Sequence, residues 1–156
     1  MERVHFIGIG GAGMAPLAAI LLEHGAAVSG SDREANAKTA ELARHGAVVH
    51  IGHDAANLPP DATLAVYSSA VPENNPERRR AAELKIPQLR RGGFLAELTR
   101  QYRRLAAVSG SHGKTSVTAM LAHILVKAEL KPGFLIGAAV NGGASASAGA
   151  GNDIFV

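Results

Sequence analysis

Two glycine-containing loops, each placed after an apolar segment, hold the residues whose types and spacing could do chemistry. In the first loop, Gly8, Gly10 and Gly13 match the pattern G-x-G-x-x-G between the apolar segments Val4–Ile7 and Met14–Leu22. Glycine lets the backbone turn tightly and approach a diphosphate, whose charge is held by free N–H groups at a helix N-terminus. The loop therefore predicts diphosphate binding. The alternative is that these glycines only permit a tight turn.

Two polar residues are expected to lie near this first loop. Asp32 ends the apolar segment Ala26–Asp32 and follows Gly13 by 19 residues. An acid at this position hydrogen-bonds a nucleotide in many doubly wound proteins, although Asp32 could instead cap the helix that follows it. His53 comes just after the next expected strand and faces the same side, so it is a candidate ligand contact.

The second loop, Gly110–Ser116, contains the G-K-T core of a P-loop. In such loops backbone N–H groups cradle phosphates, the lysine (here Lys114) reaches the outer phosphate oxygens and the hydroxyl (here Thr115) is placed to ligate Mg²⁺. Val108 stands where the usual pattern has its first glycine, so this loop is shortened. Lys114 could also be a solvated lysine, but a cation at a helix N-terminus is unfavourable unless an anion lies there.

Together the two loops predict two phosphorylated ligands. A simple NAD-dependent dehydrogenase would use only the first loop, and an ordinary P-loop ATPase would use only the second.

Alternating strands and helices are predicted to position both loops. The predicted strands are Val4–Ile7, Ala26–Asp32, Ala47–His50, Thr63–Ser69, Ile86–Leu89 (a candidate edge strand), Arg104–Ser109 (buried), Phe134–Ile136 and Asp153–Val156. The predicted helices are Met14–Leu22, a helix ending at His45, Asn75–Lys85, Phe94–Tyr102 and a helix from the second loop to Glu129, with Asn141–Gly151 as a loop. This alternation indicates an α/β fold with a parallel, doubly wound sheet.

Composition excludes several classes of protein. The 156 residues are 47% hydrophobic and 19% charged, which is typical of a globular domain, and they include no cysteine for disulfides or thiolate metal sites. A reducing cytoplasm is therefore the expected location. The start of the chain is not typical of a signal peptide, and no apolar stretch reaches the roughly 18 residues of a membrane span, so no membrane association is expected.

The segment Arg78–Arg104 holds nine Lys and Arg against Glu83 and Glu97. Its simplest interpretation is a solvated surface, and the alternatives are steering of an anionic substrate or binding of nucleic acid. Only Phe94 and Tyr102 supply aromatic rings in this segment. We therefore expect no nucleic-acid partner, since stacking platforms are nearly absent.

The chain resembles the Mur ligase family of peptidoglycan synthesis, and within it the alanine-adding branch. The matching phrases, in the family's order, are His5–Met14, Val28–Asp32, Tyr67–Val71, Asn75–Glu77, Leu89–Arg91 with Leu95–Leu98, Ser109–Thr115 and Val140–Gly143. His112 is typical of the alanine-adding and muropeptide-recycling branches. Ser111 and Ser116 stand where the family usually has threonine, and each keeps a hydroxyl.

The resemblance implies that residues 1–105 form a Rossmann-like UDP-sugar-binding domain. It implies that residues 106–156 form the N-terminal part of a central P-loop ATP-binding domain that is truncated. The implied UDP-sugar-binding residues are Gly8, Gly10, Gly11, Ala12, Gly13, Met14, Asp32, His53, Ser69 and Ala70. The implied ATP-binding residues are Gly110, Ser111, His112, Gly113, Lys114, Thr115 and Ser116, of which Lys114 and Thr115 are catalytic and the Thr115 hydroxyl holds Mg²⁺.

The activity implied by the resemblance is ATP-dependent joining of L-alanine to the carboxylate of UDP-N-acetylmuramate through an acyl phosphate. The implied small molecules are therefore ATP, Mg²⁺, UDP-N-acetylmuramate and L-alanine. In the family, Mg²⁺-holding acids and an amino-acid-binding domain follow the strand that resembles Asp153–Val156, so this chain is expected to be inactive alone. The alternatives are a ligase that adds a recycled peptide to the same sugar and a nucleotide-binding module without catalysis.

Overall fold

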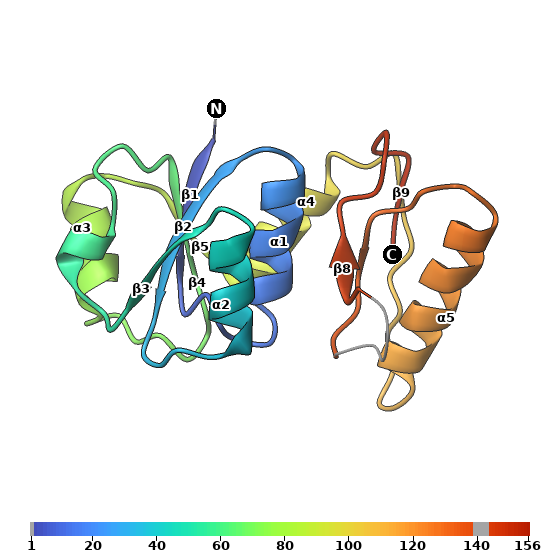
Figure 1. Cartoon of the computed structure of the whole chain (residues 1–156), viewed down its shortest axis with the longest axis horizontal. Helices are drawn as coiled ribbons and strands as arrows, with labels where there is room; N and C mark the ends of the chain where they lie inside the picture. Colours follow the sequence, from blue (N-terminus) through green and yellow to red (C-terminus); the bar gives the residue numbers. More distant parts are fainter. Residues whose placement is uncertain (1, 139–143) are drawn as a thin grey trace. The chain divides into compact units, whose positions relative to one another are not determined.

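The computed structural model describes residues 2–138 and 144–156. The chain divides into two compact units, Met1–Leu95 and Ala96–Val156, and each is described by itself (Figure 1). The phrase Val140–Gly143 lies outside the described residues. Among the described residues, none of the helices combines the length and the apolar character needed to cross a bilayer.

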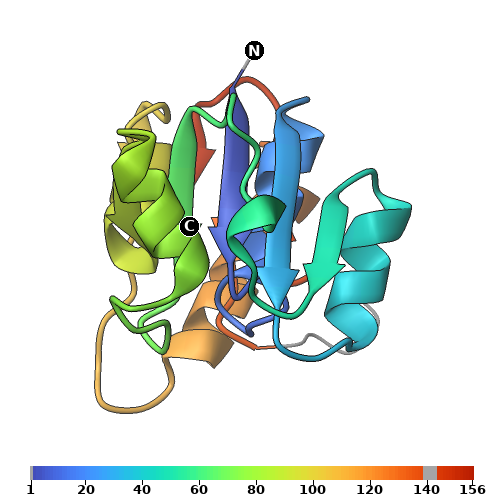
Figure 2. The same ribbon diagram turned by 90° about the vertical axis from the view of Figure 1, so that its left-hand side faces the viewer.

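The first unit is built on a five-stranded sheet in the order β3-β2-β1-β4-β5, with every pair of neighbours parallel (Figure 2). The strands are β1 (Arg3–Ile7), β2 (Ala27–Asp32), β3 (Val48–Ile51), β4 (Leu64–Tyr67) and β5 (Gln88–Arg90). The predicted parallel, doubly wound sheet is confirmed. The short strand β5 lies at one edge, as the sequence predicted.

Helices cover both faces of this sheet (Figures 1 and 2). The helical elements are α1 (Ala15–Glu23), α2 (Ala37–Arg44), the 3-10 helix η1 (Ala55–Asn57), α3 (Pro76–Glu83) and α4 (Arg91–Thr99). Helices α1, α2 and α4 lie on one side of the sheet, and α3 lies on the other with η1 beside it (Figure 1). The helix predicted over Phe94–Tyr102 begins three residues earlier, because the chain turns directly from β5 into α4.

The core of the first unit lies between the central strands and α1. Phe6 and Ile7 of β1 and Leu17 of α1 are fully buried, and Phe6 meets Phe94 edge to face with ring centroids 5.6 Å apart. Gly30 on β2 is part of this packing, because a Cβ atom there would lie 2.5 Å from the carbonyl oxygen of Phe6. Glycine at this position therefore lets the loop that follows β1 lie close to β2.

The second unit holds two small sheets beside one helix. Its strands are β6 (Arg104–Leu105) and β9 (Ile154–Phe155), which pair in parallel, and β7 (Phe134–Leu135) and β8 (Ala146–Ser147), which pair antiparallel. The strand predicted over Arg104–Ser109 was expected to be buried, but both residues of β6 are exposed, since β9 is its one described strand neighbour. Strand β8 lies inside the segment predicted to be a loop.

Helix α5 (Lys114–Lys127) follows the second glycine loop, as predicted. A small core forms where the Tyr102 and Phe155 rings meet at 4.9 Å between centroids, and the Tyr102 hydroxyl donates to the carbonyl of Ala148 at 2.7 Å. In contrast, Met120 and Ile124 of α5 are 64% and 61% exposed. The described residues therefore bury only part of the apolar surface of α5.

The packing around Gly30 gives a direct test of the fold. We expect Gly30→Ala to destabilise the first unit by about 2–3 kcal/mol, because the added methyl group would overlap a backbone oxygen that cannot move independently. Gly92→Ala is the matched control, since a Cβ atom at Gly92 in α4 meets nothing within 4 Å. The control should gain about 1 kcal/mol of helix propensity. Urea unfolding measures both, and equal stability of the two variants would contradict this packing.

Candidate phosphate-binding sites

The first glycine loop is held against the end of β2. The N–H groups of Gly8 and Ile9 both donate to the carbonyl of Ser31, at 2.8 and 2.9 Å. Gly8 has a φ of +85°, and the Gly11 N–H closes the next turn by donating to the Gly8 carbonyl at 3.1 Å. The loop is therefore rigidly placed at the carboxyl end of the sheet, where doubly wound proteins bind ligands.

Two backbone donors of this loop remain available. The N–H groups of Ala12 and Gly13 form no hydrogen bond with any described residue, whereas the Met14 N–H donates to the Gly11 carbonyl at 3.0 Å. Helix α1 begins immediately afterwards, with no side-chain cap and no acidic residue in its first turn. Free N–H groups at the positive end of a helix form an anion-binding site. The Met14 side chain is 1% exposed and belongs to the core.

Asp32 braces the loop from the neighbouring strand. Its Oδ2 atom accepts a hydrogen bond from the Gly10 N–H at 2.8 Å. The alternative role of Asp32 as a helix cap is wrong, because Asn36 caps α2 and accepts from the N–H groups of Lys38 and Thr39. A Cβ atom at Gly10 would lie 2.6 Å from Nδ2 of Asn36. Gly10 is therefore required by internal packing, whatever binds to the loop.

The segment Ser68–Val71 after β4 lies beside the same loop. A Cβ atom at Gly8 would stand 3.3 Å from the Ser68 Cβ atom. Ser69 and Ala70 are exposed in this segment. Arg78 contacts this segment and the end of β4. Its Nη1 atom donates to the Val71 carbonyl at 3.3 Å, and its guanidinium lies 4.0 Å from the centre of the Tyr67 ring. The simplest interpretation of the basic segment as solvated surface is therefore wrong for Arg78.

Arg91 is a site residue that the motif analysis did not select. A Cβ atom at Gly13 would lie 3.0 Å from Cδ and 3.3 Å from Nε of Arg91, so this side chain lies directly over the loop. Arg91 is the first residue of α4, a position where a cation is unfavourable without an anion nearby. The same argument applied to Lys114 could have singled out Arg91 from sequence.

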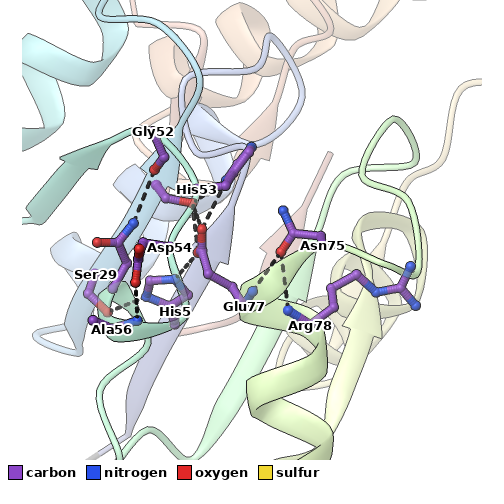
Figure 3. Close-up of polar contacts among 11 residues, drawn as sticks. His5, Ser29, Gly52, His53, Asp54, Ala56, Asn75, Glu77 and Arg78 are labelled. Atoms are coloured by element: carbon purple, nitrogen blue, oxygen red, sulfur yellow. Dashed lines mark hydrogen bonds and ion pairs between the residues drawn. The ribbon is translucent and has the colours of Figure 1, made fainter.

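A buried polar cluster lies beneath the loop that follows β3 (Figure 3). Its centre is the carboxylate of Glu77, which is fully buried in the first turn of α3. His5 of β1 approaches Oε2 through Nε2 at 2.7 Å, and His53 approaches Oε1 through Nδ1 at 2.9 Å. The Ser31 hydroxyl donates to the same carboxylate at 2.7 and 2.8 Å, and the Ser29 hydroxyl lies 2.9 Å from Nδ1 of His5.

The surroundings of Glu77 favour its charged form. Burial by itself raises the pKa of the carboxyl group, but hydrogen bonds from His5, Ser31 and His53 and the electrostatic attraction of His5 lower it more, so the pKa of Glu77 lies below its ordinary value. The N-terminal end of α3 adds favourable electrostatics for a carboxylate. His53, predicted as a ligand contact, is also a member of this cluster, and its side chain is 17% exposed.

The second glycine loop has the geometry of an anion-binding loop. Gly113 caps α5 with a φ of +78°, and the N–H groups of Ser111, His112 and Gly113 form no hydrogen bond with any described residue. The Lys114 ammonium group turns back to donate to the carbonyls of Gly110 and Ser111 at 2.5 and 3.2 Å. The lysine is thus held at the mouth of the loop, where a phosphate would compete for it.

The metal prediction rests on Thr115. In the part of the chain that the structure describes, no group of three His, Cys, Asp or Glu side chains could hold a metal ion. The Thr115 hydroxyl, in the first turn of α5, is exposed and forms no hydrogen bond with a described residue. This hydroxyl could supply one oxygen ligand to a hard cation that is also held by phosphate oxygens.

These features define a class: an α/β protein with a glycine loop at the carboxyl end of a doubly wound sheet and a second loop with a G-K-T core in the unit that follows. The chain belongs to the Mur ligase family, since the family model described as "Mur ligase family, catalytic domain" matches residues 3–103.

Known relatives agree with this assignment. A UDP-N-acetylmuramate–L-alanine ligase of Streptomyces griseus is 49% identical over the whole of this chain, which covers 33% of that relative. The crystal structure of a UDP-N-acetylmuramate-alanine ligase from Thermotoga maritima matches 99% of the chain with a TM-score of 0.89 and 32% identity, and the chain covers 36% of it. A UDP-N-acetylmuramate:L-alanyl-gamma-D-glutamyl-meso-diaminopimelate ligase from Neisseria meningitidis matches with a TM-score of 0.86 and 34% identity, over 99% of this chain and 51% of that one.

The Glu77 cluster predicts how the stability of the chain depends on pH. Because the pKa of Glu77 is lowered in the folded state, its contribution is complete above the ordinary glutamate pKa of about 4.3 and is lost as the pH falls below it. We expect Glu77→Gln to cost about 3–5 kcal/mol at pH 7, because it breaks a buried charged network. The cost should shrink as the pH falls toward 3, which urea unfolding at a series of pH values measures.

Glu83→Gln is the control on the same helix. Glu83 forms an exposed pair with Arg80 at 3.2 Å, and such pairs contribute about 0–1 kcal/mol. A loss of stability that is the same for both variants, or that does not change with pH in Glu77→Gln, would contradict a charged carboxylate in the core.

Proposed function

We propose that this chain is the UDP-sugar-binding part, together with the beginning of the ATP-binding part, of a cytoplasmic ATP-dependent ligase that joins L-alanine to the carboxylate of UDP-N-acetylmuramate. The observation that carries the proposal is the pair of loops with free N–H groups, at Ala12 and Gly13 and at Ser111–Gly113. The printed functions of the relatives supply the identity of the two phosphorylated ligands.

In this proposal the diphosphate of the UDP-sugar lies on the first loop. The N–H groups of Ala12 and Gly13 and the positive end of α1 face it, and the Arg91 guanidinium adds a full positive charge beside Gly13. Ser69 and Ala70 border the site from β4, while Asp32 and His53 border it from the side of β2 and β3. Gly8, Gly10 and Gly11 contribute through the shape of the turn, and Met14 through the core.

ATP lies on the second loop, with its phosphates against the N–H groups of Gly110–Ser116. The Lys114 ammonium then exchanges the Gly110 carbonyl for phosphate oxygens, a stronger charged partner. When bound, Mg²⁺ would neutralise charge on the transferred phosphoryl group, and the Thr115 hydroxyl is the described group that would hold it.

The proposed ligation has two chemical steps. An oxygen of the muramoyl carboxylate attacks the γ-phosphorus, ADP departs, and an acyl phosphate forms. The amine of L-alanine then attacks the acyl carbon, phosphate departs and the amide is formed. The residues of this chain mainly position the reactants and offset negative charge, which is what phosphoryl transfer requires of a protein.

The chain spans about one third of the length of the curated relatives that it matches. We therefore propose residues 1–105 as the UDP-sugar domain and residues 106–156 as the first part of the ATP-binding domain, with L-alanine recognised elsewhere. Alone, these 156 residues are proposed to bind the nucleotide sugar and not to catalyse ligation.

A second candidate is a ligase that adds a peptide to the same sugar. The observation in its favour is the Neisseria meningitidis peptide ligase, whose TM-score of 0.86 and identity of 34% are close to the 0.89 and 32% of the Thermotoga maritima alanine ligase. Both candidates share the UDP-sugar and ATP sites. They differ in the acceptor amine, so ligation assays of the full-length protein with L-alanine and with the tripeptide distinguish them.

Titration calorimetry of the 156-residue chain tests the proposed function directly. We expect UDP-N-acetylmuramate to bind with a stoichiometry near one and NAD to produce no binding heat, because the relatives of this chain are named for UDP-N-acetylmuramate. Binding of NAD without binding of the UDP-sugar would show that the chain is a dinucleotide-binding module instead.

Arg91 gives the sharpest variant for the first site. We expect Arg91→Ala to weaken binding of UDP-N-acetylmuramate at least about tenfold, since a charge-assisted hydrogen bond contributes about 1.5–3 kcal/mol. Arg79→Ala is the matched control, because Arg79 is an exposed arginine on α3 within the same basic segment. Equal affinities of the two variants for UDP-N-acetylmuramate would show that Arg91 does not contact the ligand and contributes only to the general positive charge of the basic segment.

Lys114 tests whether the two loops are separate sites. In the full-length protein, Lys114→Ala is expected to reduce ATP binding below detection and to leave the affinity for UDP-N-acetylmuramate within about twofold, because the lysine belongs to the second unit. Lys127→Ala, at the other end of α5, is the control. Loss of both ligands in Lys114→Ala, with the fold intact, would refute two independent phosphate loops.

A further inference from the structure

The Glu77 cluster fixes the position of one proton. The cluster surrounds the carboxylate with the Ser31 hydroxyl, Nε2 of His5 and Nδ1 of His53, all within 2.9 Å. An ionised carboxylate can only accept hydrogen bonds. The Ser31 hydroxyl also lies 2.9 Å from Nδ1 of His53, but it donates its one hydrogen to Glu77. Each ring nitrogen that faces the carboxylate must therefore carry a hydrogen, so in a neutral His53 the proton lies on Nδ1.

The remaining nitrogen of His53 then has a defined character. In a neutral imidazole one nitrogen donates and the other accepts, so Nε2 of His53 is an acceptor. Because Nδ1 points at Glu77, the rigid ring directs Nε2 away from the cluster (Figure 3). The side chain is 17% exposed, whereas Glu77 is fully buried. The cluster thus presents a single hydrogen-bond acceptor toward the edge of the sheet.

The backbone around His53 is also fixed. The Gly52 N–H donates to the Asp32 carbonyl at 2.7 Å, and the Gly52 carbonyl accepts from Nδ2 of Asn57 at 3.0 Å. Asp54 caps the short helix η1 by accepting from the Ala56 N–H at 2.8 Å. Neither the loop nor the ring is therefore free to reorient when a ligand arrives.

We propose that Glu77 is a positioning residue that holds His53 as the Nδ1–H tautomer, so that Nε2 accepts a hydrogen bond from an O–H or N–H group of the nucleoside part of the UDP-sugar. The inference rests on the proposed function for the ligand and on the cluster itself for the tautomer. In the strand order β3-β2-β1, His53 follows β3 and lies two strands from the diphosphate loop after β1. An acceptor lone pair repels phosphate oxygens, whereas ribose hydroxyls and the uracil imide N–H are donors.

Nitrogen-15 NMR of the histidine rings tests the tautomer in the free 156-residue chain. At pH 8.5, where an ordinary histidine is neutral, we expect the His53 spectrum of the Nδ1–H form. In Glu77→Gln the carboxylate is replaced by an amide whose NH₂ group donates hydrogen bonds. A ring nitrogen that faces this NH₂ group must accept, so the variant should move His53 or His5 toward the other tautomer. An Nε2–H form of His53 in the wild-type chain would overturn the proposal, whether or not the variant folds.

Affinity measurements test the consequence for the ligand. His53→Asn keeps a donor near the position of Nδ1 and removes the Nε2 acceptor, so we expect it to weaken UDP and UDP-N-acetylmuramate binding by the same factor, about tenfold. His45→Asn is the control, because His45 is exposed and caps the far end of α2. An unchanged affinity, or a loss confined to UDP-N-acetylmuramate and absent with UDP, would overturn the nucleoside contact.

The two measurements also separate this proposal from the proposed function. If the wild-type chain bound no UDP-sugar, the proposed function and the ligand contact would both fail. The ring spectrum would still decide whether Glu77 sets the tautomer of His53.

Discussion

One buried negative charge organises the sheet on which the nucleotide-sugar site is proposed to lie. Removing a carboxylate from water costs several kcal/mol, and Glu77 is fully buried. The cost is offset only because groups from β1, β2 and the loop after β3 all converge on it, at the positive end of α3. Those segments are distant in the sequence, so the charge enforces their relative positions at the carboxyl end of the sheet.

The same need to satisfy polar groups explains the two loops. In the first loop the N–H groups of Gly8, Ile9, Gly10 and Gly11 donate to the end of β2, to Asp32 or within the turn, whereas those of Ala12 and Gly13 form no hydrogen bond with a described residue. In the second loop the Lys114 ammonium satisfies two carbonyls but leaves the neighbouring N–H groups free. Free N–H groups at a helix N-terminus next to a fixed cation favour a bound anion, which is why both loops support phosphate binding.

Sequence patterns predicted the sheet, both loops and the helix after each loop, because these depend on local periodicity and on glycine at fixed offsets. They did not predict the Glu77 cluster, since Glu77 contacts His5 across 72 residues and looks like an ordinary first-turn acid of a basic helix. Arg91 was missed for a different reason: the helix was predicted to begin at Phe94, so the place of Arg91 at a helix N-terminus was not recognised, and its contact with Gly13 depends on how α4 packs. The exposure of β6 was mispredicted, because the mostly apolar segment Arg104–Ser109 says nothing about which strands flank it.

The most direct test of the central claim is an amide NMR titration of the 156-residue chain with UDP-N-acetylmuramate. If the free N–H groups of the first loop hold the diphosphate, the resonances of Ala12 and Gly13 will show the largest saturable shifts, followed by that of Arg91. The resonances of Ser111–Gly113 should remain unchanged. Shifts centred on the second loop, or none at Ala12 and Gly13 at saturation, would contradict the account.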